Sequence, residues 1–576
     1  MIYPWLLPLL VLATGIVVNH YFNLYVPTLA AILVLIISAG LNGFFRYIVL
    51  NLGVFLLALS ITYTEKIPDL NIKTPSFFEC RVVSFPDYHR NLTSFDCKIL
   101  NCDYKEVIGK TVKVYSQEEG IYFYSRLAFL GKGKVEDGKV KLTTIKHFTK
   151  VDNSDNPFYN LFKIKDGLIQ NYGLHRLNNE TFAVGTALIF GETKYLDSQT
   201  YKPFVETGLA HLIAISGGHI AILFFSLSTL LFFLSERARY VILGFLLPFY
   251  ALFTGFGIPV VRAVFMAVFY VISKLLYLKN NPLNILFFTA FFFLVLKPDS
   301  LFSVSFQLSF LATLGIIMSI EIFRDYSNLV KLIVASIFAT IFTTPIILYN
   351  FYNFSPTSIF ATPIATLPLY PLLTLSVVNI FLGFNVDFLV KVMDFFGYIF
   401  LKVVKFFASL GLYYTGFSPS LVWIFIYFTV ILFILLLNLR PLQKLTYIIL
   451  TFIVFLAVSK NYDSSSKIYT FKSKKYPVIF VSDKGNCYLI ADFEYKKALN
   501  LLKKEGCKVS YLLTENPENF SDDFTTNFNR VLSYQYQINI NGILFKKWVE
   551  PYILIYGREF YLKNEDNVIS LQSSGI

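Results

Sequence analysis

Long apolar stretches alternate with polar segments along this chain, and their lengths predict membrane-spanning helices. A helix needs about 20 predominantly apolar residues to cross a bilayer. Three such stretches precede residue 63, roughly at 4–19, 26–41 and 45–62, and about eight more lie between residues 182 and 459. The first stretch carries no Lys or Arg and no small-residue cleavage site, so we expect an anchor there and not a removed signal peptide.

Two polar segments have the pattern of β-structure. Between about Thr74 and Lys150, short alternating runs predict strands at 77–85, 93–100, 110–116 and 126–145. Within the last run, Gly131-Lys-Gly predicts a bulge and Asp137-Gly138 a hairpin turn. Several short strands in so small a segment fit a β-barrel, and an OB-fold is the leading candidate. The chain after Lys460 is again polar and rich in predicted strands.

The pattern therefore predicts a polytopic α-helical membrane protein with an OB-like β-barrel domain and a short α/β C-terminal domain. The expected domains are N-terminal transmembrane helices at 1–64, about three in number, the OB-like domain at 65–153, a second membrane domain with amphipathic helices at 154–459, and the C-terminal domain at 460–576.

Composition agrees with a membrane protein. Apolar residues make up 55% of the chain and the mean hydropathy is +0.58, which argues against a soluble protein of this length. The formal charge of +13 suits an anionic membrane surface or a nucleic acid, and it equally fits the excess of cations in the cytoplasmic loops of membrane proteins. Residues 387–412 carry three lysines on an aromatic helix, which predicts an interfacial amphipathic helix and not a span.

Cations in the short loops predict the topology. Arg46, Arg237, Arg239 and Arg440 mark cytoplasmic loops. The N-terminus is then inside, and the OB-like domain follows the third span on the outer side of the membrane. The C-terminal segment follows a last outward span, so we expect it outside as well.

Cations and tyrosines are interspersed in the predicted OB-like domain. Basic groups beside aromatic stacking platforms are typical of proteins that bind single-stranded nucleic acid. The alternative is that these aromatic side chains pack the barrel core or rest on the bilayer interface. The candidate nucleic-acid ligands are Arg81, Tyr88, Arg90, Lys113, Tyr115, Arg126, Lys132 and Lys134.

The five cysteines form two groups. Cys80, Cys97 and Cys102 lie in the first polar segment, and Cys487 and Cys507 in the second. Each group can form one disulfide if it lies outside the cytoplasm. The chain has no Cys-x-x-Cys, which argues against a structural zinc site.

Four polar groups interrupt the second apolar block, at a depth where polar groups mark a pathway or a site by default. The alternatives are a loop position for Glu192, interfacial or helix-packing roles for the histidines, and helix-to-helix hydrogen bonds for the polar residues near 307. A lone arginine beside Pro259 requires a partner or water. The candidate residues are Glu192, His211, Ser216, Gly217, Gly218, His219, Arg262, Gln307 and Ser309.

The segment Gly208-Leu-Ala-His-Leu-Ile-Ala-Ile-Ser-Gly-Gly-His219 resembles the hallmark of the ComEC family, the inner-membrane DNA channels of natural competence. Three further segments resemble family motifs in the same order. They are Leu188 to Glu192, Gly255 to Ala263, and Pro298-Asp299 followed by Phe306-Gln-Leu-Ser-Phe310. The resemblance covers roughly residues 1–440.

This resemblance implies a channel for single-stranded DNA at 154–459 in the cytoplasmic membrane, with no catalytic residues and no cofactor. It also implies an extracytoplasmic DNA receptor, a cytoplasmic helicase-like translocase and single-strand-binding proteins as partners, with membrane lipids around it and an oligomer as an open option. Many members end in a metallo-β-lactamase-like domain, but this chain has no histidine after His219. We therefore expect 460–576 to be a shortened remnant without metal ligands.

Two rival functions remain at the level of sequence. The first is a transporter of another anionic polymer or of a lipid-linked substrate. The second is an intramembrane serine hydrolase, because Ser216 and His219 are one helical turn apart. The segment lacks the Gly-x-Ser-x-Gly pattern and an evident acidic partner, which argues against the hydrolase.

Overall fold

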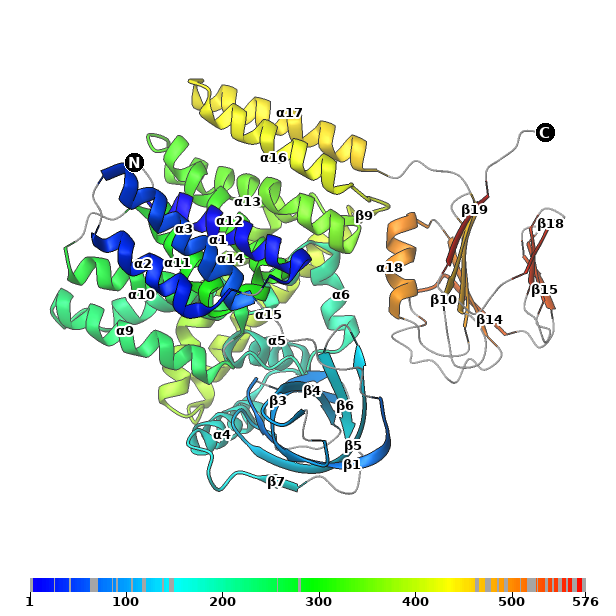
Figure 1. Cartoon of the computed structure of the whole chain (residues 1–576), viewed down its shortest axis with the longest axis horizontal. Coiled ribbons are helices and arrows are strands. Elements are labelled where there is room, and N and C mark those ends of the chain that lie inside the picture. Colours follow the sequence, from blue (N-terminus) through cyan, green and yellow to red (C-terminus); the bar gives the residue numbers. More distant parts are fainter. Residues whose placement is uncertain are drawn as a thin grey trace. The chain divides into compact units, whose positions relative to one another are not determined.

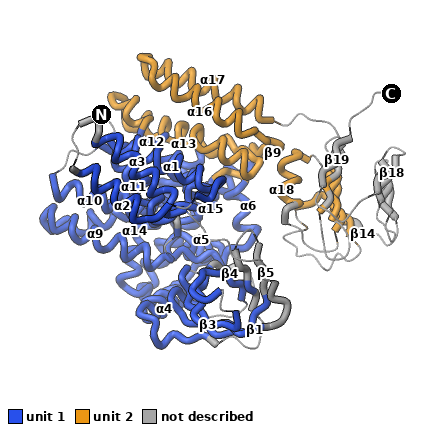
Figure 2. The backbone as a smooth tube through the Cα atoms, viewed as in Figure 1, with its two compact units in different colours: residues 1–205, 209–317, 360–409 blue, residues 206–208, 318–359, 410–576 orange. Residues whose placement is uncertain are grey.

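The computed structural model describes most of the membrane region and parts of the two polar domains. The described residues are 4–24, 26–40, 43–62, 71–84, 86–89, 92–104, 107–116, 121–136, 139–144, 150–255, 257–277, 281–460, 466–471, 478–483, 486–491, 496–507, 509–514, 525, 527–533, 537–540, 543–546, 552–555, 558–561 and 567–571. They fall into two compact units (Figure 2). Unit 1 comprises 1–205, 209–317 and 360–409, and unit 2 comprises 206–208, 318–359 and 410–576.

Unit 1 begins with three apolar helices, which coincide with the three stretches predicted before residue 63. They are α1 (Leu6–Phe22), α2 (Thr28–Gly40) and α3 (Gly43–Thr62). Helices α1 and α3 pack closely, because a Cβ added at Gly15 would lie only 2.6 Å from that of Ala58. The buried Asn19 donates from Nδ2 to the carbonyl of Leu59 at 2.7 Å. This bond satisfies an amide that would otherwise be costly inside an apolar bundle.

The described residues of the first polar segment form a sheet that has a strand in each of the four predicted strand segments. Strand β1 pairs antiparallel with both β3 and β5, and β4 pairs parallel with β6. Irregular register between Glu79 and Cys80 in β1 bends the strand between its two partners. The predicted turn at Asp137-Gly138 lies outside the described residues. The strands are β1 (Asn71–Val82), β2 (Asp87–His89), β3 (Leu92–Cys102), β4 (Thr111–Ser116), β5 (Arg126–Glu136), β6 (Lys139–Thr144) and β7 (Lys150–Asp152).

The remaining helices of unit 1 pack around several apolar cores, and one of them brings together helices from both ends of the unit. This core joins residues of α5, α7, α14 and α15, including Leu188, Leu212, Leu369 and Phe400. The helices are α4 (Tyr159–His175), α5 (Asn179–Phe190), α6 (Ser198–Glu206), α7 (Ala210–Ile213), α8 (Gly217–Leu230), α9 (Glu236–Phe253), α10 (Ile258–Leu275), α11 (Pro282–Leu296), the 3-10 helix η2 (Pro298–Phe302), α12 (Val304–Ile322), α14 (Ser358–Phe381) and α15 (Asp387–Ser409). Figure 1 shows the succession of these helices along the chain.

Unit 2 contains α13 (Asn328–Phe351), α16 (Leu421–Leu436) and α17 (Pro441–Ser459). The hydroxyl of the buried Tyr427 in α16 donates to the carbonyl of Ile341 in α13 at 3.0 Å. Between these helices, β8 (Asn353–Phe354) and β9 (Tyr414–Thr415) form a short antiparallel pair.

The chain is a helical membrane protein. Within the described residues, four helices are long and apolar enough to cross a membrane, namely α12, α13, α14 and α17. Shorter apolar helices of 10–17 residues include α1, α8, α11 and α16. Helix α15 is not among the candidate spans. Its aromatic and lysine side chains share an exposed face, with Phe388 73% exposed and Phe406 62% exposed, as the prediction of an amphipathic helix requires.

The C-terminal segment is an α/β domain, as predicted. A six-stranded sheet has the order β14-β13-β12-β11-β10-β19, and α18 packs on it through Ala498 and Leu502 (Figure 1). The remaining strands form a separate four-stranded sheet. The elements are β10 (Ser466–Phe471), β11 (Val478–Asp483), β12 (Asn486–Ile490), α18 (Lys496–Glu505), β13 (Val509–Thr514), β14 (Arg530–Ser533), β15 (Gln537–Ile540), β16 (Ile543–Lys546), β17 (Tyr552–Ile555), β18 (Arg558–Tyr561) and β19 (Asn567–Leu571).

Candidate functional site

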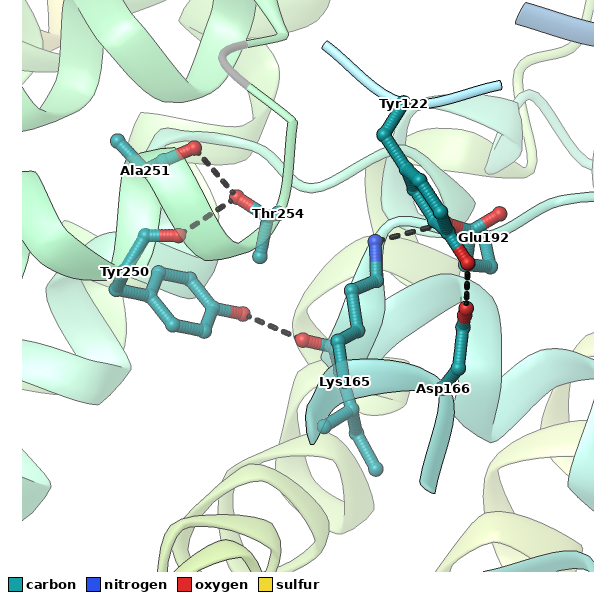
Figure 3. A network of polar contacts seen from close by, with 8 residues as sticks. Tyr122, Lys165, Asp166, Glu192, Tyr250, Ala251 and Thr254 are labelled. Atoms are coloured by element: carbon teal, nitrogen blue, oxygen red, sulfur yellow. Dashed lines mark hydrogen bonds and ion pairs between the residues drawn. The ribbon is translucent and has the colours of Figure 1, made fainter. Parts of the chain in front are cut away.

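The first polar group lies where α5 ends. Gly191 adopts a left-handed conformation with φ 72°, and its N–H donates to the carbonyl of Ala187, which closes the helix. The chain then turns so that Oε1 of Glu192 lies 2.7 Å from Nζ of Lys165 in α4 (Figure 3). The two side chains are only 19% and 9% exposed. Glu192 is therefore held in a largely buried ion pair and is not a solvated loop residue.

The second polar group is a break between two helices. Helix α7 ends at Ile213, Ala214 and Ser216 are extended, and α8 begins at Gly217. The side chains of Ser216 and His219 meet at this break, because Oγ lies 2.8 Å from Nδ1. The backbone N–H of Ser216 also donates to that Nδ1 at 3.2 Å. His219 is 2% exposed, which makes it part of the packing that fixes the start of α8.

The exposed residues of this segment are His211, Ala214 and the two glycines. Gly217 and Gly218 occupy the first turn of α8 on an exposed surface, and His211 is exposed on α7. The first four backbone N–H groups of a helix have no partner within the helix. Two of these groups have partners in α8, because the N–H of Ser216 donates to Nδ1 of His219 and the N–H of His219 donates to the side chain of Ser216. The space beside Gly218 is open, because a Cβ added there would contact only Oγ of Ser216.

The third polar group joins α9 to α10. The hydroxyl of Thr254 donates to the carbonyls of Tyr250 and Ala251, and the hydroxyl of Tyr250 donates to that of Ile189 (Figure 3). Gly255 then has φ 96°, a conformation that favours glycine, before Gly257 and Pro259 start α10. These turns place Arg262 in the first turns of α10.

Arg262 is buried, with 2% of its surface exposed. Its Nη1 donates to the carbonyl of Ser305 in α12 at 2.5 Å. Its guanidinium carbon lies 5.9 Å from the ring centre of Phe306 and 5.5 Å from that of Phe310. Nε and Nη2 have no hydrogen-bond partner among the described residues. A buried charge without a counter-ion costs several kcal/mol, so this position is not explained by packing alone.

The fourth polar group serves mainly to support α12. The side-chain amide of Gln307 donates to the carbonyl of Leu301 at 3.0 Å, and the carbonyl of Ser309 accepts from the hydroxyl of Thr313 at 2.8 Å. The residues of this motif that contact Arg262 are instead Phe306 and Phe310, which the polar pattern of the sequence did not single out. Their spacing of four residues, which places them on one face of a helix, was the available signal.

The four groups contact one another in series. A Cβ added at Gly191 would lie 2.8 Å from the carbonyl oxygen of Thr254 and 3.5 Å from Cδ1 of Ile215. A Cβ added at Gly217 would lie 3.9 Å from that of Ala263. Arg262 then reaches the fourth group through Ser305. The fold thus joins in one series segments that extend from Leu188 to Phe310, while Glu192 pairs with Lys165 and not with Arg262.

Helix α4 connects this assembly to the sheet of β1 to β7, called the β-domain below. Its Asp166, next to Lys165, accepts a hydrogen bond of 2.7 Å from the hydroxyl of Tyr122 (Figure 3). The ring of Tyr122 also stacks on Phe162, with centroids 5.5 Å apart. The aromatic residues of the loop before β5 therefore dock on α4, which supports the packing interpretation for this part of the aromatic set.

The candidate nucleic-acid ligands of the β-domain differ in their surroundings. Arg81 donates to the hydroxyl of Tyr124 at 3.0 Å, and Arg126 is paired with Glu79 at 2.6 Å. Lys132 is exposed, and the exposed Lys113 lies 5.9 Å from the ring centre of Tyr115. Arg90 lies outside the described residues, and the side chains of Tyr88 and Lys134 are likewise not described.

The cysteines are paired within their two groups. Cys80 is bonded to Cys97, and Cys487 to Cys507. Cys102, the third cysteine of the first group, is a buried thiol whose Sγ donates to the carbonyl of Tyr104. Burial raises the pKa of this thiol, which keeps it protonated and unreactive.

Comparison with known proteins places this arrangement in a family. Residues 188–458 match the family model described as Competence protein, and this range contains all four polar groups. Residues 188–458 form a Competence protein domain, and together with the relatives below this supports a ComEC-family competence protein.

Three relatives of this ComEC-family chain differ in how much they share. An uncharacterized protein of Aquifex aeolicus is 30% identical over 261 residues, which are 45% of this chain and 60% of the relative. ComE operon protein 3 of Bacillus subtilis is 28% identical over 218 residues, or 37% of this chain and 28% of the relative. Recombination protein 2 of Haemophilus influenzae is 33% identical over 132 residues, which are 21% of this chain and 17% of the relative. The matches thus span less than two thirds of each relative's length. No solved structure matches the chain.

Proposed function

We propose that this chain is a cytoplasmic-membrane channel that passes single-stranded DNA into the cell during natural transformation. The observation that carries the proposal is the serial contact among the four polar groups. Helix breaks at Gly191, Ala214 and Gly255, together with the buried Arg262, lie within the range that matches the Competence protein model.

Physical chemistry requires such a path to be polar. A DNA strand carries one phosphate charge per ~3.4 Å at duplex spacing, so about nine charges would occupy a ~30 Å hydrocarbon core. Irregular backbone at membrane depth is tolerated where it lines a cavity or is buried in protein. The exposed first turn of α8 and the turn between α9 and α10 supply such backbone. His211, Ser216, Gly217, Gly218 and Arg262 are the residues that we assign to the path, with Glu192, Gln307 and Ser309 as its support.

We further propose that residues 65–153 form an OB-like barrel on the outer face of the membrane. The pairing order β1-β3-β4-β6-β5 returns to β1 through the β1–β5 pairing, and its one parallel pair is β4 with β6. The two disulfides favour an extracytoplasmic position for this domain and for the C-terminal domain. Lys113, Tyr115 and Lys132 are the best placed ligands for an incoming strand.

The driving force must come from another protein. An inside-negative potential opposes each entering phosphate by about 2.3 kcal/mol per 100 mV. The sequence has no Gly-x-x-x-x-Gly-Lys-Ser/Thr phosphate loop, so we assign the work to a cytoplasmic helicase-like translocase and to single-strand-binding proteins, with a DNA receptor outside. In this proposal the chain itself is not an enzyme.

The test is import of labelled duplex DNA into cells that carry the wild type, a deletion or Arg262→Ala. We expect the deletion strain to keep DNA at its surface while no label becomes resistant to external nuclease. Loss of import in Arg262→Ala, with the protein present in the membrane, would place this residue on the path. Normal import in the deletion strain would reject the proposal and favour a transporter of another anionic polymer or of a lipid-linked substrate.

A serine hydrolase is the second candidate, because Ser216 and His219 form the 2.8 Å contact that a nucleophile and its base require. Against it, no carboxylate of the described residues orients His219, whose Nδ1 also accepts the N–H of Ser216. Ser216→Ala and Ser216→Thr separate the two functions. In a channel, import should fall only mildly in both variants, with a modest loss of stability in the first. A hydrolase loses its activity in Ser216→Ala.

A further inference from the structure

Arg262 is a cation that the described part of the protein encloses but does not neutralise. One of its three nitrogens donates to a backbone carbonyl, and Nε and Nη2 have no partner. Its other close neighbours are the rings of Phe306 and Phe310. Aromatic faces attract a cation weakly, but they do not replace a carboxylate or water. The position is therefore one where an anion would be strongly favoured if space opened beside the guanidinium.

The N-terminus of α12 adds a positive partial charge near Arg262. Ser305 lies in the first turn of α12, a helix of 19 residues, so Arg262 is beside the positive end of that helix dipole. The N–H of Phe306 already donates to the hydroxyl of Ser303. A guanidinium and a helix N-terminus together are the groups that proteins use to bind phosphate oxygens.

The two rings differ in how firmly they are held. Phe306 is 6% exposed and stacks on Phe293, with centroids 5.9 Å apart. Phe310 is only half-buried and contacts Phe306 at 4.4 Å between centroids. Phe310 can therefore change rotamer at a lower cost in free energy than Phe306, whose ring is packed against α11.

We propose that Arg262 is an anion-binding site for the phosphodiester groups of the translocated strand, and that Phe310 covers it in a closed state while Phe306 forms a fixed wall. This inference rests on the proposed channel function. Passage of a strand requires Phe310 to swing away, so that phosphate oxygens reach Nε and Nη2. The cover also explains how a membrane channel with a cation on its path avoids leaking small anions between uptake events.

The experiment measures chloride and potassium flux in liposomes that contain the purified full chain. The variants are Phe310→Ala, Phe306→Leu and the double variant Phe310→Ala with Arg262→Gln. Phe245→Ala, at a side chain that is 73% exposed on α9, is the matched control for loss of an aromatic ring. We expect Phe310→Ala to raise chloride flux by about tenfold with little change for potassium, because the uncovered cation concentrates anions. The double variant should lose this preference, and the control should match the wild type.

Several results would overturn the inference. One is a Phe310→Ala protein that is folded, as judged by the same elution volume as the wild type in size-exclusion chromatography, and that has the same chloride flux. Another is a raised flux whose anion preference survives Arg262→Gln. If Phe310→Ala does not fold, Phe310→Leu keeps most of the side-chain volume and must still raise chloride flux. The DNA import assay is independent of these fluxes. Normal import in a deletion strain would reject the channel function. If the deletion abolishes import but the flux prediction fails, only the proposed covering of Arg262 by Phe310 is rejected.

Discussion

Lys165 and Glu192 form an ion pair of 2.7 Å that connects α4 to the turn after α5. The neighbouring residue on α4, Asp166, accepts a hydrogen bond from Tyr122 of the β-domain. One turn of α4 therefore contacts both the β-domain and the first polar group of the membrane region. This arrangement makes α4 the element that positions the β-domain relative to that group within unit 1.

Removal of one partner from this pair should be costly. Lys165→Met leaves the carboxylate of Glu192 largely buried without a counter-ion, and we expect the free energy of unfolding to fall by about 3 kcal/mol. Thermal unfolding in detergent measures this. Lys391→Met is the matched control, since its pair with Asp387 is exposed and of the i,i+4 type, and should change stability by less than about 0.5 kcal/mol. Adding Glu192→Gln to Lys165→Met should recover part of the loss, and no recovery would show that the two charges do not interact.

Gly191 should tolerate no side chain. Gly191→Ala combines a positive φ, which costs an L-residue about 1 kcal/mol, with a Cβ 2.8 Å from the carbonyl oxygen of Thr254. Gly411→Ala is the control, because Gly411 has φ 65° with nothing within 4 Å of an added Cβ. We expect Gly191→Ala to lower the unfolding temperature clearly more than Gly411→Ala, and to impair DNA import as well. Equal effects would mean that α5 and α9 do not meet at this contact.

Asp394 of α15 gives a pH-dependent prediction. Its Oδ1 accepts from the hydroxyl of Tyr172 at 2.6 Å and its Oδ2 from the N–H of Leu177 at 2.8 Å. Burial nevertheless raises its pKa from the usual value of 3.8. A carboxyl with a raised pKa in the folded state binds its proton more tightly there, so its contribution to stability declines as the pH rises from 3.8 through the folded pKa.

The measurement compares unfolding temperatures of the wild type and Asp394→Asn across this pH range. The advantage of the wild type over the variant should shrink as the pH rises, because the amide does not titrate. An advantage that grows with pH would show that the hydrogen bonds from Tyr172 and Leu177 outweigh burial and lower the pKa instead.

The Cys80–Cys97 disulfide should stabilise the β-domain. It closes a loop with a sequence separation of 17 residues. Closing a loop of this size lowers the conformational entropy of the unfolded chain, which raises the free energy of unfolding by about 3 kcal/mol. Replacing both cysteines with alanine should lower the free energy of unfolding of the β-domain by a similar amount. The resistance of residues 65–153 to protease measures this loss. Cys102→Ala is the control, and a comparable loss there would indicate that packing and not the cross-link stabilises the sheet.

Local patterns in the sequence determined the elements of this protein. Apolar runs of span length, alternation in 77–145 and the lysine spacing of α15 each depend on neighbouring residues, so helices and strands could be predicted close to where they form. The break before Gly217 could also be predicted, because paired glycines and Ser216 are local signals. The Leu188, His211, Pro259 and Phe306 segments are local motifs too, and they carry the resemblance to the family.

Tertiary structure alone decided which of these segments meet. That Gly191 packs on Thr254, that Lys165 neutralises Glu192, and that Phe306 and Phe310 enclose Arg262 depend on helix packing between distant parts of the chain. Side-chain partners across such separations have no periodic signature in one sequence. The pairing of Cys80 with Cys97, and not with Cys102, follows for the same reason, since strand register determines which sulfur atoms face each other.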